Sequence, residues 1–364
     1  MNKLCFSWLF LCLVTVTVTE FDYECEALSH GVVTVNDLGF PPIWTSRRGM
    51  LASTMAPYLF PNAAKAQEPL VMADPGLSIA TARVLQSQAD EAASRVTPQH
   101  VHQYQTTGVC KVENVVSDAW IQALRDGCEL AQDEAGPFAE YLHKPTDTGT
   151  FFTDLELARR LPLFSAFSLY GPAAAVAGQV LGSNTIRYLY DQLFVKQQGV
   201  STVTPWHQDG GYWRVKGTQV ASVFVPLDPV KADQGLQFVT ASNTWPLHNP
   251  QHFCDGTPYR GTSLPPLPDI DAQPNKWTFQ TFDLQPGDVL VFSSHTVHGG
   301  PGNWGRALST RWVGDDATFW NRPGEGAVPT SDDVPLRDGQ ALAAAPQWFP
   351  TSWTSKATDK CGIL

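Results

Sequence analysis

The hydrophobic and polar positions divide the chain into a helix-rich first half and a strand-rich second half. Alanines and leucines recur among scattered charges over residues 74–95, which predicts a helix of modest amphipathicity. Ser117 precedes a second helical pattern and is a suitable N-cap, because its hydroxyl can accept a hydrogen bond from the first turn. A third, mostly helical stretch is expected over 155–181, with breaks near Pro162 and at Gly171-Pro172.

After Gly182, short runs of β-branched and aromatic residues replace the helical periodicity, and such runs predict strands. The strands predicted for the whole chain are 107–116, 186–196, 220–227, 235–239, 278–284, 289–292 and 306–313. A loop rich in proline and glycine interrupts them at 245–275, and its length indicates a functional role. This order favours an α+β fold with a double-stranded β-helix (jelly-roll) core and flanking N-terminal helices.

Residues 1–67 are predicted to be a targeting presequence. An apolar run at 4–19 is short for a membrane span and typical of the core of a signal peptide. Arg47-Arg48 then precede a weaker apolar run and an Ala-Lys-Ala sequence at 64–66, as in a twin-arginine export signal. Two leaders in series predict delivery to a plastid and on to the thylakoid lumen, or otherwise export by a twin-arginine-type route.

The composition describes an acidic, globular protein. Hydrophobic residues make up 43% of the 364 positions and charged residues 16%, which excludes a disordered chain. We expect one mature domain, 68–364, with its core at about 100–320 and without a stable membrane span. The net charge of −11 excludes the basic face of a nucleic-acid-binding protein and leaves a small molecule as the expected partner. The seven cysteines form no Cys-x-x-Cys pair, so we expect no structural zinc site and a free, buried Cys110 and Cys128.

A His-x-Asp sequence at His207 and Asp209 is the first candidate for chemistry. On an extended strand both side chains project from one face, within reach of one metal ion. His298 is a possible third ligand, and two histidines with one carboxylate form the facial triad of non-haem Fe(II) oxygenases. His295 is the alternative third ligand, although the Gly-Gly-Pro that follows His298 favours His298.

Several motifs occur in one order along the chain. They are Trp206-His-Gln-Asp-Gly-Gly-Tyr-Trp, Gln234-Gly-Leu-Gln-Phe-Val-Thr-Ala-Ser-Asn, Leu284-Gln-Pro-Gly-Asp-Val-Leu-Val-Phe and His298-Gly-Gly-Pro-Gly-Asn, with Asp191-Gln-Leu-Phe-Val-Lys upstream. Together they resemble the phytanoyl-CoA dioxygenase family of Fe(II)/2-oxoglutarate-dependent oxygenases. The resemblance covers about residues 100–320, and the ordered motifs make it far more specific than an isolated His-x-Asp.

The resemblance implies that His207, Asp209 and His298 hold Fe(II), with 2-oxoglutarate and O2 as co-substrates. It also implies an arginine on the last core strand that binds the distal carboxylate of 2-oxoglutarate, which a planar guanidinium can do with two hydrogen bonds. That position falls on Arg306. Arg311 is the alternative, and because five positions separate the two, they point to opposite faces of a strand.

The same resemblance suggests further residues around the co-substrate. Lys196 is a candidate for 2-oxoglutarate binding, although a surface lysine with its stem on apolar groups fits equally well. Gln192, with Asp191, is a candidate for the lining of the site. Four aromatic residues are expected either at the mouth of the site or in the core, namely Trp206, Tyr212, Trp213 and Trp304.

The expected reaction is hydroxylation of a small organic substrate, with release of succinate and CO2. Asp209 argues against halogenation, because halogenating relatives give up this carboxylate so that chloride can bind. Two alternatives stay open: a non-catalytic jelly-roll binding protein with a vestigial metal site, and an oxygenase with the same metal site that does not use 2-oxoglutarate. The loop at 245–275 is where we expect substrate specificity to lie.

Overall fold

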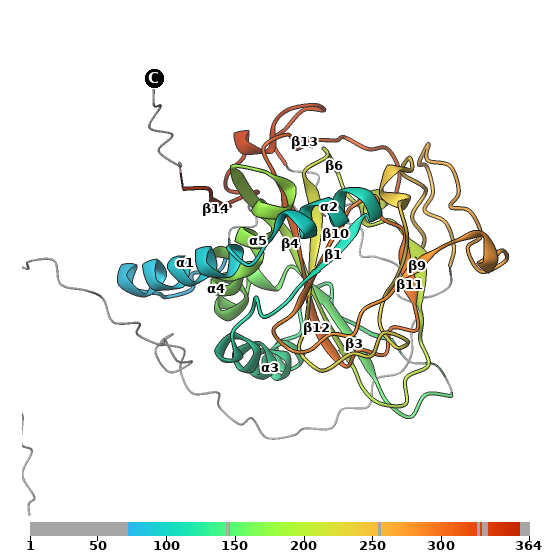
Figure 1. Cartoon of the computed structure of the whole chain (residues 1–364), viewed down its shortest axis with the longest axis horizontal. Coiled ribbons are helices and arrows are strands. Elements are labelled where there is room, and N and C mark those ends of the chain that lie inside the picture. The colour runs from blue at the N-terminus through green and yellow to red at the C-terminus, as the bar shows by residue number, and fades with distance from the viewer. Residues whose placement is uncertain are drawn as a thin grey trace, which may run out of the picture. The chain divides into compact units, whose positions relative to one another are not determined.

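The computed structural model describes residues 72–142, 144, 146–253, 256–325, 328–329 and 334–356 (Figure 1). The predicted presequence, 1–67, lies outside the described residues and stays a prediction. Cys110 and Cys128 are buried and free, as expected from the absence of a paired spacing.

Five α-helices lie within the described residues, and three of them begin at a capping side chain. The helices are α1 (Ile79–Ala93), α2 (Pro98–Thr107), α3 (Asp118–Asp133), α4 (Pro162–Tyr170) and α5 (Pro172–Leu181). Ser78, Thr97 and Ser117 each accept a hydrogen bond from the backbone N–H three residues further on. The N-cap predicted at Ser117 is therefore confirmed.

The predicted helical stretch 155–181 is wrong at its beginning. Strand β3 (Phe151–Leu155) and the 3-10 turn η2 (Leu157–Arg159) occupy that part. Pairing of β3 with a neighbouring strand outweighs its local pattern, and Glu156 adopts a left-handed conformation with a φ of 57°. Pro172 then separates α4 from α5, since it begins a new helix where its missing N–H costs nothing.

Helix α2 was not predicted, because its sequence is polar and only Tyr104 is buried. Helices α4 and α5 together make an apolar stretch, Pro162–Leu181, of 20 residues that could cross a membrane by length and composition alone. Its most apolar part is 83% buried, as in the core helices of a soluble protein.

The strands form antiparallel sheets. The large sheet has the order β1-β10-β7-β12-β4-β3-β2, with β14 also paired to β4, and a smaller sheet has the order β5-β11-β8-β9. The remaining strands are β1 (Val109–Val112), β2 (Glu140–Leu142), β4 (Thr185–Lys196), β5 (Thr204–His207), β6 (Val215–Lys216), β7 (Val220–Pro226), β8 (Gln237–Val239), β9 (Phe279–Gln280), β10 (Val289–Ser293), β11 (His298–Gly300), β12 (Arg306–Val313), β13 (Thr318–Phe319) and β14 (Thr351–Thr354). Helices precede and cover a mostly antiparallel β core, which confirms the α+β prediction.

The large sheet buries both of its faces. In Figure 1 the helices lie on one side of it and the small sheet, with β9 and β11, on the other. Leu308 and Trp312 of β12 belong to the core under the helices, whereas Ala307 belongs to the core between the two sheets. Alternation along β12 therefore places Ser309 and Arg311 with Ala307 on the inner face, toward the small sheet.

Candidate metal centre

The small sheet brings the three candidate ligands together. His207 ends β5, Asp209 begins the 3-10 turn η3 (Asp209–Tyr212), and His298 begins β11. Strand β11 runs antiparallel to β5 with His298 directly opposite His207. The register of this strand pair thus closes the gap of 89 positions between Asp209 and His298.

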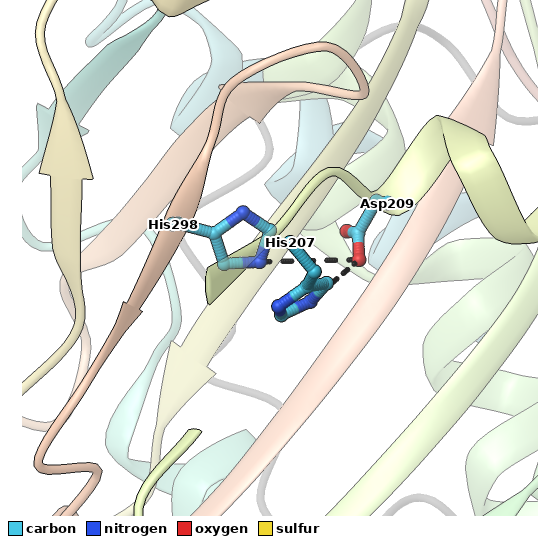
Figure 2. A group of neighbouring side chains, drawn as sticks. All are labelled: His207, Asp209 and His298. Carbon is cyan, nitrogen blue, oxygen red and sulfur yellow. Dashed lines mark ion pairs between the residues drawn. The ribbon is translucent and has the colours of Figure 1, made fainter. Parts of the chain in front are cut away.

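The ligand atoms of these residues converge on one point (Figure 2). The Nε2 atom of His207 lies 3.5 Å from Oδ1 of Asp209, and Nε2 of His298 lies 3.9 Å from the same oxygen. One ligand atom from each residue lies within 4.8 Å of the others, and all three residues are buried. Among the described residues this is the only such group of histidine, cysteine and acidic side chains.

Backbone carbonyls fix the orientation of both imidazoles. Nδ1 of His207 lies 2.7 Å from the carbonyl of Pro205, and Nδ1 of His298 lies 2.9 Å from the carbonyl of Thr296. A carbonyl can only accept, so each Nδ1 carries a proton, and Nε2 is the nitrogen that is left to bind a metal. Burial, with repulsion from His207, lowers the pKa of His298 to about 3, so its ring is neutral at physiological pH.

Asp209 is held as a carboxylate. Ser222 of β7 donates a hydrogen bond of 2.5 Å to Oδ2, which leaves Oδ1 directed at the two Nε2 atoms. Burial opposes ionisation, but the contact with His207 and the positive charge of Arg311 outweigh it and hold the pKa of Asp209 well below its usual range. Two imidazole nitrogens and one carboxylate are the donor set of non-haem iron(II), so the residues fit this metal.

Ser222 is expected to support metal binding through Asp209. In a Ser222→Ala variant the carboxylate loses the donor that fixes Oδ2, so we expect iron(II) affinity to fall by about 10- to 100-fold. Iron titration of the metal-free protein measures this loss. Ser309→Ala is the matched control, because Ser309 lies on the same inner face and contributes only its carbonyl, to Arg311. Equal iron affinity in both variants would contradict the role given to Ser222.

The structure brings Arg311, and not Arg306, to the metal centre. Arg306 faces the helices and forms a two-point ion pair with Asp228, with distances of 2.9 Å from Nε to Oδ2 and 2.7 Å from Nη2 to Oδ1. Arg311 is 4% exposed on the inner face, and its Cζ lies 4.7 Å from the centroid of the Tyr190 ring. The sequence correctly places the two arginines on opposite faces, but it does not tell which face is the inner one.

Gln192 and Lys196 share the inner face of β4 but have different surroundings. Gln192 accepts a hydrogen bond of 3.0 Å from Nη2 of Arg311, so it lies beside the centre. Lys196 donates to the carbonyls of Thr202 and Pro301, and burial lowers its pKa to about 8. Lys196 lies six positions after Tyr190, which is about 20 Å along the strand. The structure therefore places Lys196 at the far end of the inner core, away from the metal ligands.

Asp191 and His295 lie outside the group of metal ligands. Asp191 is on the helix side of β4, where it accepts a hydrogen bond from the N–H of Ala158 and where burial raises its pKa to about 7. Nδ1 of His295 contacts the carbonyl of Trp245 at 3.1 Å. His298 is thus the histidine that the fold brings to His207 and Asp209.

The four aromatic residues expected near the site divide between its surroundings and the core. The Tyr212 ring lies 5.8 Å from that of His207, whereas Trp304 packs on Phe224 inside the sheets. Trp213 is fully buried and donates to the hydroxyl of Tyr190, and Trp206 donates to Asp271. Sequence reasoning missed Ser222 and Phe253, a loop residue beside His207; only the strand alternation of β7 could have indicated Ser222.

The family model described as phytanoyl-CoA dioxygenase (PhyH) matches residues 104–310, more than half of the chain. The chain belongs to this family. As a phytanoyl-CoA dioxygenase family protein it belongs among the iron- and 2-oxoglutarate-dependent oxygenases, and its His-Asp-His group could hold the iron. No curated protein matches the chain.

Solved structures share the fold of this family member at low sequence identity. The non-haem α-ketoglutarate-dependent carbocyclase SnoK from nogalamycin biosynthesis aligns with a TM-score of 0.56 and 17% identity, over 72% of this chain and 98% of SnoK. The epimerase SnoN, in complex with Fe3+, α-ketoglutarate and nogalamycin RO, aligns with a TM-score of 0.53 and 16% identity, over 70% and 98% of the two chains. The shared fold confirms the predicted jelly-roll core.

Proposed function

We propose that this protein hydroxylates a small organic substrate, using Fe(II), 2-oxoglutarate and O2 and releasing succinate and CO2. The observation that carries the proposal is the convergence of two Nε2 atoms and one carboxylate oxygen on one buried point, with both Nδ1 protons bound by carbonyls. A vestigial site would have no need of three oriented ligands. The non-catalytic alternative is therefore the weaker one.

Different residues would bind the metal and the co-substrate. His207, Asp209 and His298 would hold the iron, and Arg311 would bind the distal carboxylate of 2-oxoglutarate. Tyr190 lies under the guanidinium and Gln192 accepts one of its N–H groups, so Arg311 is already oriented before the co-substrate binds. Bound iron, together with 2-oxoglutarate and O2, supplies the oxidising power that inserts oxygen into a C–H bond.

Asp209 favours hydroxylation over halogenation. Its Oδ1 atom is directed at the histidine nitrogens while Ser222 holds Oδ2, so a carboxylate occupies the ligand position that chloride would need. The carbocyclisation and epimerisation named for SnoK and SnoN belong to those proteins, and at 16–17% identity their likeness extends to the fold alone.

Anaerobic addition of Fe(II) and 2-oxoglutarate tests the proposal. We expect a weak visible charge-transfer band that saturates with one 2-oxoglutarate per iron and is absent when either component is left out. Admission of O2 should then yield succinate and CO2. Iron binding without the band would favour an oxygenase that does not use 2-oxoglutarate. A protein that binds neither iron nor 2-oxoglutarate would be the non-catalytic alternative.

A further inference from the structure

The first part of the long loop, residues 245–253, is attached to the segment that carries two of the metal ligands. Gln208 stands between His207 and Asp209, and its side chain holds the loop. Its Nε2 donates to the carbonyl of Pro246 at 3.2 Å, and its Oε1 accepts from the N–H of His248 at 2.8 Å. The residue between the ligands therefore fixes the beginning of the loop.

A second set of hydrogen bonds fixes the loop further along. The hydroxyl of Tyr212 donates to the carbonyl of Gln251 at 2.6 Å and accepts from the N–H of the same residue at 3.2 Å. Nε2 of Gln251 donates to the carbonyl of Trp206 at 3.2 Å. The loop is thus bound on both sides of the ligand segment and forms a fixed cover.

The glycines after Asp209 permit this close approach. A Cβ atom on Gly210 would lie 2.9 Å from Cδ2 of Leu247, and one on Gly211 would lie 2.8 Å from the carbonyl oxygen of His248. The backbone of these glycines is not left-handed, so contact with the loop, and not their φ angle, requires them. Glycine at both positions after Asp209 therefore allows the loop to pack directly on the backbone of the ligand segment.

The fixed loop holds an aromatic wall beside the metal centre, formed by Tyr212, Phe253 and Tyr259. The Phe253 ring lies 4.9 Å from the His207 ring and 5.8 Å from that of Tyr212, and the side chain remains 38% exposed. Tyr259 extends the wall at 5.4 Å from Tyr212. Phe253 thus contacts a metal ligand on one side and solvent on the other.

The charged groups around the aromatic wall are already bound by other groups of the protein. Glu325 lies 3.5 Å from Nε2 of His252 and accepts a hydrogen bond of 3.0 Å from the N–H of Arg260. The guanidinium of Arg322 is buried and donates to the carbonyls of Gly211 and Glu325. Charges that are already bound offer little to an ionic ligand, whereas the aromatic faces favour apolar contact.

We propose that the substrate places an uncharged, apolar carbon skeleton against the aromatic wall, and that Phe253 is the residue that selects it. The inference rests on the proposed function and concerns the substrate class of the same centre. A hydrocarbon ring or chain that reaches the metal past the Phe253 edge buries its apolar surface there. A charged group against the wall would lose part of its hydration shell, and the charges nearby are already bound by other groups.

Three probes with one ring system and different charge test the proposal: indole, indole-3-acetate and tryptamine. Each is titrated into the anaerobic protein loaded with Fe(II) and 2-oxoglutarate, and the change in the charge-transfer band gives its Kd. We expect indole to bind at least about tenfold more tightly than indole-3-acetate, because partial desolvation of one charged group costs at least that much. Tightest binding of tryptamine or of indole-3-acetate would overturn the assignment of an uncharged skeleton.

Variants of Phe253 test the residue itself. Phe253→Ala should weaken indole binding about tenfold, since an aromatic contact is lost. Phe253→Leu keeps an apolar side chain of similar volume and should stay within about threefold of the natural protein. Tyr141→Ala is the matched control, because Tyr141 is 57% exposed on β2 and packs on Phe152 in the core under the helices.

These experiments distinguish a failure of the proposed function from a failure of the role given to Phe253. If the natural protein forms no charge-transfer band, the proposed function fails. If the band forms but Phe253→Ala binds indole as the natural protein does, the function stands and the role of Phe253 is refuted. An equal loss in Tyr141→Ala would also refute it.

Discussion

Replacement of Asp209 by alanine is expected to abolish 2-oxoglutarate turnover and most iron binding. The variant loses the only anionic ligand of the centre, and Nε2 of His207 and Nε2 of His298 lose the oxygen that lies 3.5 Å and 3.9 Å away. The loss in iron affinity should exceed the roughly 10- to 100-fold effect of removing an outer hydrogen-bond partner. Iron content after dialysis and succinate release measure the two effects.

Two further variants separate charge from shape at this position. Asp209→Asn keeps the size of the side chain and its contact with Ser222 but lacks the negative charge, so we expect it to lose iron as the alanine variant does. Asp338→Ala should retain full turnover, because Asp338 is exposed and binds only the N–H of Asn321 among the contacts described. Succinate formation at the natural rate in Asp209→Ala would refute the metal centre.

Two of the three candidate metal ligands could be predicted from the sequence because local geometry alone brings them together. His207 and Asp209 are two positions apart, and their shared side of the chain follows from extended geometry. His298 required the resemblance to a family, since only the pairing of β11 with β5 places it opposite His207. That register depends on long-range contacts, which no local pattern in the sequence reveals.

The arginine that would bind the distal carboxylate of 2-oxoglutarate could not be identified from the sequence alone. Alternation separates Arg306 from Arg311 but assigns neither to a face, because β12 is buried on both sides and carries polar residues on both. Its inner face becomes identifiable only when Ser222 of β7 is seen to pair with Arg311 and to contact Asp209. Helix α2 and strand β3 were missed for a related reason, since both are determined more by what they pack on than by their own periodicity.

Replacement of Arg311 by alanine is expected to weaken 2-oxoglutarate binding by at least about 30-fold, which corresponds to about 2 kcal/mol for the loss of one partner of a buried charge pair. The Arg311 side chain is buried and held by Gln192 and Tyr190. In the alanine variant, water cannot easily take its place as the partner of the 2-oxoglutarate carboxylate. Arg311→Lys keeps the charge but not the planar fork, and we expect an intermediate loss. Titration of the charge-transfer band with 2-oxoglutarate measures the Kd of each variant.

Arg306→Ala is the matched control on the same strand. It breaks the ion pair with Asp228, whose partners are 35% and 27% exposed, so the expected cost is at most about 1 kcal/mol of unfolding free energy, with the 2-oxoglutarate Kd unchanged. The reverse result, with a weakened Kd in Arg306→Ala alone, would return the anchor to Arg306. Unchanged turnover in both variants would mean that the distal carboxylate has no arginine partner, and would favour an oxygenase that works without 2-oxoglutarate. The two arginines, five residues apart on opposite faces of β12, therefore decide between the co-substrate assignments.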